Sequence, residues 1–300
     1  MRIGTRASSL AVVQAEHVAE LLGADDVVPI STSGDRGAPA SDKSRWVAEL
    51  EQALIKGRID IAVHSAKDVP GELAPGLELL GSPQRAPAED ALCGVESLAQ
   101  LPPGARVGTS SIRRAAQLRA LREDLELLPL RGNVDTRLAK LRDASDGVRA
   151  LVLARAGLQR LRREDAIGEV LDPRRFVPAP GQGALALEGR ADDDSVRRAA
   201  HACSDRATFA CLLAERSLAQ SLQASCHTPL GAHAAPAGAG RLLLRSWVGL
   251  PDGSEWIADE LTGELADPRS LGEHGAERLR AVGAAELLRR AQEMADVAVT

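Results

Sequence analysis

The sequence predicts an α/β fold for most of the chain and a smaller α+β region at its C-terminal end. Short apolar strands alternate with amphipathic helices, which is typical of parallel sheets covered by helices on both faces. The last ~95 residues, a span of ordinary domain size, differ because two adjacent strands come first and helical runs follow. With 300 residues, 44% of them apolar, the chain can build two or three packed domains.

The first series of elements alternates strand and helix. We expect a strand at residues 1–5, a helix at 8–22, a strand at 26–32, a helix at 45–57 and a strand from residue 58 to the break at Pro70. Gly23 marks the end of the first helix because glycine accepts the left-handed backbone that often follows a helix. The second helix is amphipathic, with Trp46, Leu50 and Leu54 on one face.

A second series repeats the order strand, polar loop, helix in three units, at residues 105–121, 125–141 and 148–161. The Gly-rich segment 178–189, PAPGQGALALEG, is a loop before a strand and matches neither a dinucleotide-binding motif nor a phosphate-binding loop. Such a segment is typical of a crossing between domains. Near the C-terminus, residues 241–263 read as two strands joined by a Pro-Asp-Gly turn.

Composition disfavours several classes of function. The opening residues MRIGTRASSL contain no secretory signal, and no apolar run approaches the ~20 residues of a membrane span. We therefore expect a cytoplasmic protein with no membrane partner. The net charge of −5 disfavours general nucleic-acid binding. The four cysteines form no CxxC pair, so in a reducing compartment we expect neither a disulfide framework nor a metal site.

Cys226 stands in the segment SLQASCHTPLG, between a helix-like run and a turn. Taken alone, this cysteine could be a small buried apolar residue, half of a disulfide, a metal ligand or a nucleophile that carries another group. The number and spacing of the cysteines weigh against the disulfide and the metal. The residues themselves leave the buried residue and the carrier open. We expect Cys93, Cys203 and Cys211 to pack as small apolar residues.

Cationic side chains follow several predicted strands, at the positions where ligands bind in open parallel sheets. They are Arg6, Lys67, Arg113, Arg114, Arg131, Arg137 and Arg160, with Thr109, Ser110, Ser111, Gly132 and Asn133 at the adjoining helix starts. Arginine forks match carboxylates, and helix starts bind anions. The pattern predicts a site for a ligand with many acidic groups. Any one of these arginines, taken alone, could equally be a solvated residue on a helix surface.

Asp68 is the carboxylate that stands out among these cations. It directly follows Lys67 at a strand end, in a loop closed by Pro70. A carboxylate among cations stays ionised and can pair with a developing cation or exchange a proton with a substrate. The alternative is a structural salt bridge or a helix cap. We expect His64, on the preceding strand, to be a packed residue rather than a catalytic one.

Seven segments carry a resemblance to a known family. They are IGTRASSLAVVQ, DIAVHSAKDVP, VGTSSIRRAAQL, LRGNVDTRLAKL, LARAGLQRL, GQGALALE and the turn around Cys226. From residue 3 to about residue 250, their order and spacing resemble those of the porphobilinogen deaminase (hydroxymethylbilane synthase) family. The resemblance implies two α/β lobes like those of a periplasmic binding protein, with the site in the cleft between them, and a smaller C-terminal α+β domain that carries the cysteine. The implied domains are residues 1–84 with 183–202, residues 87–178, and residues 206–300.

The resemblance also implies the reaction. Four porphobilinogen molecules are joined head to tail, each losing ammonia, to give hydroxymethylbilane for tetrapyrrole biosynthesis. A dipyrromethane cofactor, made from substrate and held by a thioether to Cys226, primes the growing polypyrrole and stays on the protein. Each porphobilinogen carries an acetate and a propionate, which an arginine-lined site would bind. The implied protein is a monomeric transferase with small-molecule partners. The alternative is a non-catalytic, two-lobed protein that binds a small anion.

Site residues are implied position by position. Asp68 matches the catalytic aspartate, which would hold pyrrole N–H groups, assist the loss of ammonia and stabilise the cationic azafulvene. Cofactor contacts are implied for Lys67, Asp68, Thr109, Ser110, Ser111, Arg113, Arg114, Arg131, Gly132 and Asn133, besides the covalent bond to Cys226. Substrate contacts are implied for Arg6, Ser8, Trp46, Arg137, Arg160 and Gln182.

The chain departs from the family pattern at a few positions. Ser225 stands where the family usually has glycine before the cysteine, so this loop could take a different backbone. The segment 41–46 replaces a more Gly-rich stretch; Trp46 could still stack on a pyrrole and Lys43 could still reach the site. None of these departures alters the residues matched to catalysis, so we expect the chain to be active.

Overall fold

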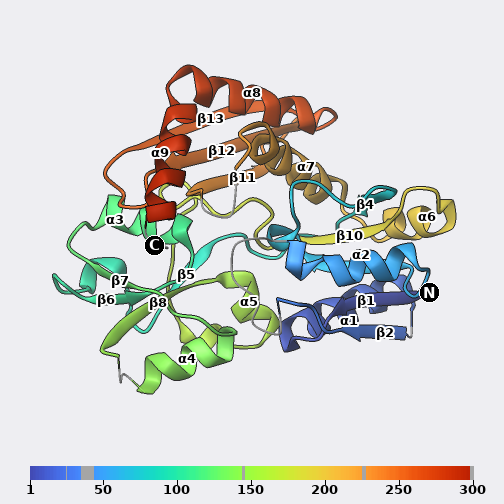
Figure 1. The fold of residues 1–300 in the computed structure, drawn as a ribbon, viewed down its shortest axis with the longest axis horizontal. Helices are drawn as coiled ribbons and strands as arrows, with labels where there is room; N and C mark the ends of the chain where they lie inside the picture. The colour runs from blue at the N-terminus through green and yellow to red at the C-terminus, as the bar shows by residue number, and fades with distance from the viewer. Residues whose placement is uncertain (25, 35–43, 144–145, 225–227, 298–300) are drawn as a thin grey trace.

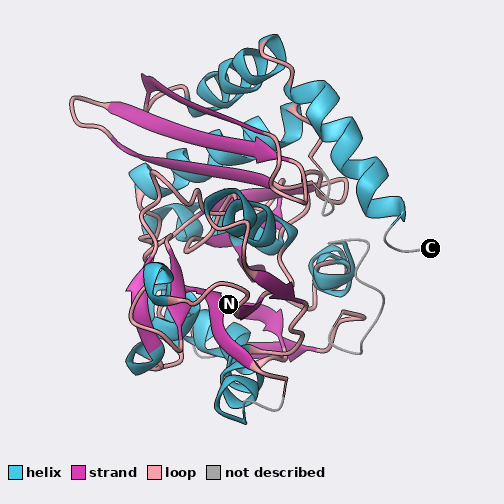
Figure 2. Ribbon diagram, turned by 90° about the vertical axis from the view of Figure 1, so that its left-hand side faces the viewer, coloured by secondary structure: helices cyan, strands magenta, loops and turns pink. Residues whose placement is uncertain are grey.

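The computed structural model describes residues 1–24, 26–34, 44–143, 146–224 and 228–297 of the chain. Two five-stranded sheets and one three-stranded sheet organise these residues. Figure 1 shows the N-terminal lobe at the right, a second lobe at the lower left and the C-terminal domain across the top of both. Figure 2, turned by 90°, shows the long strands of the C-terminal sheet packed beside its helices. The predicted fold class, two α/β lobes and a smaller C-terminal α+β domain, is confirmed.

The first lobe is built on a sheet with the strand order β2-β1-β3-β10-β4. Its strands are β1 (Arg2–Arg6), β2 (Asp26–Ile30), β3 (Ile61–Ser65), β4 (Leu77–Gly81) and β10 (Leu185–Arg190). The helices that pack against it are α1 (Ser9–Leu22), α2 (Ala48–Ile55) and α6 (Asp194–Ala202). Helix α1 ends where the sequence predicts, because Gly23 takes the left-handed backbone with φ 59° and its N–H donates to the carbonyl of Glu20.

The second lobe has a sheet with the strand order β7-β6-β8-β5-β9. Its strands are β5 (Asp90–Cys93), β6 (Arg106–Gly108), β7 (Glu126–Leu128), β8 (Val148–Ala154) and β9 (Ile167–Val170). Its helices are α3 (Ile112–Leu121), α4 (Val134–Asp143) and α5 (Arg155–Arg160). The three predicted units of strand, loop and helix are confirmed. Strand β8 lies in the middle of the sheet, so Leu151 and Val152 have no exposed surface.

Both five-stranded sheets are mixed rather than parallel, which corrects the sequence prediction. Strand β10 pairs antiparallel with β3 and β4, and β5 pairs antiparallel with β8 and β9. The reason is the path of the chain, which crosses to the second sheet after β4 and returns to the first sheet before β10. A strand reached by such a crossing enters its sheet from the opposite end. A strand buried on both faces is apolar in either direction, so its composition does not reveal its orientation.

The C-terminal domain consists of an antiparallel sheet, in the order β11-β12-β13, and three helices packed against it. The strands are β11 (Leu230–Pro236), β12 (Arg241–Gly249) and β13 (Trp256–Glu264), and the helices are α7 (Arg206–Ser221), α8 (Pro268–Ala281) and α9 (Ala284–Val297). The predicted strand pair is confirmed; the N–H of Gly253 closes its turn on the carbonyl of Leu250 at 3.0 Å. None of the described helices is long and apolar enough to cross a membrane.

Candidate active site

The turn that carries Lys67 and Asp68 begins where β3 ends. A short 3-10 helix, η2 (Ala66–Asp68), follows the strand, and the N–H of Ala66 donates to the carbonyl of Ala184 at 3.0 Å. Gly181 lies against this turn with φ +74°, a backbone conformation that glycine readily adopts, and a Cβ there would stand 2.9 Å from the carbonyl carbon of Ala66. The segment that returns from the second lobe therefore holds the Asp68 turn in place.

Two cavities meet at Asp68. The larger one, about 570 Å³ with open solvent included, lies between the lobes, and its lining brings together Lys67, Asp68, Arg114, Arg137 and Arg160. The smaller one, about 390 Å³ measured in the same way, lies beside α1, and its lining includes Arg6, Ser8, Trp46, His64 and Asp68. Among the described residues that line the two cavities, Asp68 is the only acidic one. The structure thus gathers seven other predicted site residues and His64 around the Asp68 carboxylate.

Burial shifts the pKa of three cations that line the interlobe cavity. Burial lowers the pKa of Lys67 to about 8; Arg114 lowers it further and Asp68 opposes the shift. Burial also lowers the pKa of Arg160 to about 10, and burial together with Arg114 lowers the pKa of Arg137. A carboxylate bound nearby would stabilise the charged form of each of these groups. The cavity is therefore suited to an anionic ligand.

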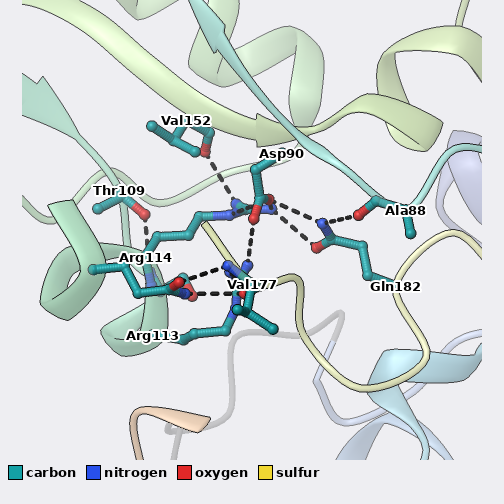
Figure 3. A network of polar contacts seen from close by, with 10 residues as sticks. Ala88, Asp90, Thr109, Arg113, Arg114, Val152, Val177 and Gln182 are labelled. Carbon is teal, nitrogen blue, oxygen red and sulfur yellow. Dashed lines mark hydrogen bonds and ion pairs between the residues drawn. The ribbon is translucent and has the colours of Figure 1, made fainter. Parts of the chain in front are cut away.

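Arg113 and Arg114 are buried and bound to Asp90, as Figure 3 shows. Arg113 Nη2 lies 2.8 Å from Asp90 Oδ2, and Arg114 Nε lies 2.8 Å from Asp90 Oδ1. Burial raises the pKa of Asp90, but the two arginines outweigh burial and hold this pKa below its usual value. Gln182 completes the network: its Nε2 donates to Asp90 Oδ1 at 3.0 Å, and its Oε1 accepts from Arg114 Nη2 at 3.3 Å. Arg114 also lines the interlobe cavity, whereas Arg113 and Gln182 line neither cavity.

Hydroxyl and amide groups of the second lobe cap its helices. Ser111 Oγ accepts from the N–H of Arg114 at 3.4 Å, and Thr109 Oγ1 accepts from the N–H of Ser111 at 3.2 Å. Asn133 Oδ1 accepts from the N–H of Thr136 at 2.8 Å. These bonds satisfy N–H groups that a helix start would otherwise leave without a partner.

The remaining predicted residues of the second lobe are exposed. Ser110, Arg131, Gly132 and Asn133 lie at the starts of α3 and α4, and none of them lines either cavity. The backbone of Gly132 supports a neighbour that does, because its carbonyl accepts from Arg137 Nε at 2.8 Å. Cofactor contacts of these four residues stay predictions.

Arg6 stacks on Trp46, with its Cζ 3.9 Å from the ring centroid. Trp46 ends the 3-10 helix η1 (Ser44–Trp46), and the ring packs so closely on Gly34 that a side chain there would collide with it. One face of the indole is therefore covered by a guanidinium, where the sequence predicts a stacking surface for a pyrrole. Ser8 lines the same cavity as these two residues.

Cys226 lies outside the described residues, as do Ser225 and Lys43, so the thioether anchor stays a prediction. The other three cysteines are free thiols. Burial raises the pKa of Cys93 to about 11 and that of Cys211 to about 12, as for small packed residues. The His, Cys, Asp and Glu residues that the structure describes form no group of three that could hold a metal ion.

Sequence reasoning missed the buried acids around the site, which are Asp90, Glu188 and Glu215. Glu188 Oε2 lies 2.8 Å from His64 Nε2 with both side chains buried, so His64 is a packed strand residue, as predicted. Glu215 Oε1 lies 2.6 Å from Arg85 Nη1. The available signal was an acidic residue inside an apolar run, as in ALALEG and CLLAER, because buried charges need partners.

Solved structures of similar shape include two binding proteins. One is the periplasmic substrate-binding protein of an ABC transporter from Coxiella burnetii, with a TM-score of 0.41 at 14% identity over 68% of this chain and 91% of that one. The other is the methionine-binding protein MetQ, with a TM-score of 0.41 at 14% identity over 67% of this chain and 89% of that one. These scores are too low for a ligand or an activity to be carried over.

Comparison at the level of sequence is far more specific. Residues 1–198 match the family model described as porphobilinogen deaminase, dipyromethane cofactor binding domain, and residues 209–281 match the C-terminal domain of porphobilinogen deaminase. The chain is 44% identical to a porphobilinogen deaminase of Deinococcus radiodurans, over 97% of this chain and 98% of the relative. It is 46% identical to a porphobilinogen deaminase of Roseiflexus castenholzii, over 96% of this chain and 98% of the relative. With both domains matched and the expected residues gathered around Asp68, the chain belongs to the porphobilinogen deaminase family.

Proposed function

We propose that the chain is a transferase that condenses four porphobilinogen molecules head to tail into hydroxymethylbilane, with the release of one ammonia per molecule. The observation that carries the proposal is the position of Asp68, one fixed carboxylate between two cavities that are lined by arginines and a lysine. The acetate and propionate of each porphobilinogen match these cations. The positive charge that develops as ammonia leaves matches Asp68.

The loss of ammonia calls for a fixed negative charge. Ammonia departs with the electron pair of the carbon–nitrogen bond, so positive charge develops on the pyrrole of the substrate. The Asp68 carboxylate would stabilise this charge and accept hydrogen bonds from pyrrole N–H groups. Such an anion acts more strongly in a cleft that excludes water than in bulk solvent. Lys67 precedes Asp68 in the same short 3-10 helix and brings a positive charge next to it.

The residues of the interlobe cavity fit the family's dipyrromethane cofactor. The cofactor's two rings carry acidic side chains, and the cations that line this cavity, Lys67, Arg114, Arg137 and Arg160, would bind them. Burial lowers the pKa of Lys67 and of Arg160, so a bound carboxylate would stabilise the charge of both residues. When bound, dipyrromethane supplies the pyrrole to which the first substrate is joined. We assign its covalent attachment to Cys226.

The smaller cavity would receive the incoming porphobilinogen. Arg6 and Ser8 line it together with Asp68, and none of the second lobe's arginines does. We further propose that the protein is a cytoplasmic monomer with small-molecule partners. The proposed domains are residues 1–84 with 183–202, residues 87–178, and residues 206–300.

An ammonia-release assay on the purified full-length chain tests the proposal. The chain is expected to release ammonia from porphobilinogen and to form hydroxymethylbilane. Asp68→Ala is expected to bind porphobilinogen while turnover falls by about 100-fold or more, because the fixed anion is lost. Near-normal turnover in this variant would remove Asp68 from its assigned role. Binding of porphobilinogen by the wild-type chain without any release of ammonia would support a two-lobed anion-binding protein instead.

A further inference from the structure

Helix α7 of the C-terminal domain reaches into the first lobe and binds the main chain directly after Asp68. Arg216 Nη2 donates to the carbonyl oxygens of Pro70 at 2.7 Å and Gly71 at 3.0 Å, and its Nη1 donates to that of Val69 at 3.4 Å. Figure 1 shows α7 between the C-terminal sheet and the first lobe. Three consecutive carbonyls therefore converge on a single guanidinium.

The neighbouring residue, Glu215, holds the other side of the same turn. Its buried carboxylate accepts from the N–H of Gly181 at 2.6 Å and from Arg85 Nη1 at 2.6 Å. Gly181 in turn packs on Ala66, the first residue of the Asp68 turn. Two consecutive residues of α7 thus fix the turn. Glu215 acts through Gly181, in the segment that precedes β10, and Arg216 binds the main chain after Asp68 directly.

We propose that Arg216 is a positioning residue for Asp68, which it places by fixing the main chain that follows this aspartate to helix α7. The inference rests on the proposed function, in which Asp68 acts on the substrate. Helix α7 ends at Ser221, five positions before Cys226 in the sequence (226 − 221), so the same helix leads to the proposed anchor. Arg216 thereby ties the position of the reacting carboxylate to the element that precedes the anchor.

The chemistry of the contact requires a guanidinium. Arginine presents several N–H donors in a rigid fork, whereas lysine presents one nitrogen on a flexible stem. Burial lowers the pKa of Arg216 to about 10 and Glu188 opposes this shift, so the group keeps its charge at neutral pH. Gln220, one turn further along α7, also donates to the carbonyl of Gly71. Lysine at position 216 would retain part of this arrangement and methionine none of it.

The chain offers a matched control for the loss of one such bond. Arg119 on α3 donates from Nη1 to the carbonyl of Pro251 at 2.8 Å, and so ties the second lobe to the C-terminal domain. Like Arg216, it is half-buried and binds the carbonyl of a proline in another domain. Arg119 lines neither cavity at Asp68. Arg119→Met therefore removes an interdomain bond of the same kind at a distance from the site.

The experiment compares full-length Arg216→Met, Arg216→Lys and Arg119→Met with the wild type. Intact mass reports the bound cofactor, steady-state kinetics report kcat and KM, and the Tm reports folding. Arg216→Met is expected to keep the cofactor mass and a KM near that of the wild type. Its kcat should fall by about 10- to 100-fold, because the Asp68 carboxylate is misplaced. The kcat of Arg216→Lys is expected to lie between those of Arg216→Met and the wild type. This second variant keeps the inference testable if Arg216→Met does not fold. Arg119→Met is expected to keep its kcat.

A double variant separates positioning from a general loss of structure. If Arg216 acts through Asp68, adding Arg216→Met to Asp68→Ala should lower kcat by less than about 2-fold further. Full additivity of the two effects would overturn the inference. So would a kcat of Arg216→Met equal to that of Arg119→Met, or a cofactor mass that is missing from both Arg216 variants. If the wild type itself releases no ammonia, the proposed function fails, and the inference fails with it.

Discussion

Asp90 Oδ1 and Arg114 Nε lie 2.8 Å apart, and Arg114 also lines the interlobe cavity. Asp90 is the first residue of β5, reached directly after the chain crosses from the first lobe, and Arg114 lies in the first turn of α3. The pair therefore joins the crossing between the lobes to a helix that borders the site. Arg114 serves the fold and the cavity at once.

Asp90→Asn is expected to destabilise the protein strongly. The variant keeps the shape of the side chain but leaves the buried guanidinium groups of Arg113 and Arg114 without their counter-charge. The free energy of unfolding should fall by about 3–5 kcal/mol, as when one partner of a buried ion pair is removed. Urea denaturation monitored by circular dichroism measures it.

A half-exposed pair at the same distance provides the control. Arg106 Nε lies 2.8 Å from Glu126 Oε2 on the surface of the second lobe. Glu126→Gln should cost about 0.2–1 kcal/mol, because water screens the pair. Equal losses in the two variants would show that Asp90 does not act through a buried charge.

The low pKa of Lys67 predicts that the binding of the cofactor by the apoprotein weakens in mild alkali. Burial lowers this pKa to about 8, with a further lowering by Arg114, so Lys67 loses its charge as the pH rises through that value. Binding of a carboxylate raises the pKa of its cationic partner, and by linkage the affinity falls once the free lysine is neutral. Apoprotein supplied with porphobilinogen should therefore gain the dipyrromethane mass more slowly above pH 8.

Lys67→Arg separates this effect from the titration of the substrate. Arginine keeps its charge throughout this range, so cofactor gain by the variant apoprotein should slow less steeply with pH. Time courses of intact mass at half-unit steps of pH measure both profiles. Identical slopes would exclude Lys67 as the titrating group.

Gly181→Ala should impair catalysis more than stability. The added Cβ would stand 2.9 Å from the carbonyl carbon of Ala66 and 3.0 Å from the N of Lys67, so the turn that carries Asp68 must shift. Gly104 is the matched control, because it has the same φ of 74° but no atom within 4 Å of an added Cβ. Both alanine variants carry the strain of a left-handed backbone.

A comparison of the two glycine variants isolates the effect on the turn. Only Gly181→Ala is expected to lose kcat, by about 10-fold or more, because small displacements of reacting groups are costly. Both should retain the cofactor mass. A kcat that falls equally in Gly181→Ala and Gly104→Ala would refute the view that Gly181 shapes the turn.

The stacking of Arg6 on Trp46 predicts a role of the ring in orienting this arginine. The guanidinium carbon lies 3.9 Å from the ring centroid, and both side chains line the smaller cavity. Trp46→Ala removes about 0.5–1 kcal/mol of cation–π attraction, so the KM should rise by about 2- to 5-fold. Trp46→Phe keeps a ring and should show a smaller rise. An unchanged KM in Trp46→Ala would contradict this role.

The sequence alone predicted most elements of the fold, because periodicity and helix-end signals are local. The helix that ends at Gly23 and the strand pair at 241–263 are examples. The direction of β5 and β10 could not be predicted, since it depends on which way the chain crosses between lobes and not on the residues of the strand. Polar pairs between residues far apart in the sequence could not be predicted either.

The candidate site shows the same division. The motifs named Lys67, Asp68, Arg137 and Arg160, and the structure gathers them around one cavity. The pairing of Arg113 with Asp90 joins residues 23 positions apart, and the contact of Arg216 with Pro70 joins residues 146 positions apart. No local pattern records such contacts. The network of buried acids therefore emerged only from the structure.

The mass of the intact chain tests the central claim most directly. Purified under conditions where porphobilinogen is present, the wild-type chain should exceed its sequence mass by one dipyrromethane, and Cys226→Ser should show the sequence mass of the variant alone. Asp68→Ala serves as a control variant, because it leaves the proposed anchor cysteine in place. A wild-type chain of unmodified mass under these conditions, or an equal excess in Cys226→Ser, would contradict a cofactor held by Cys226.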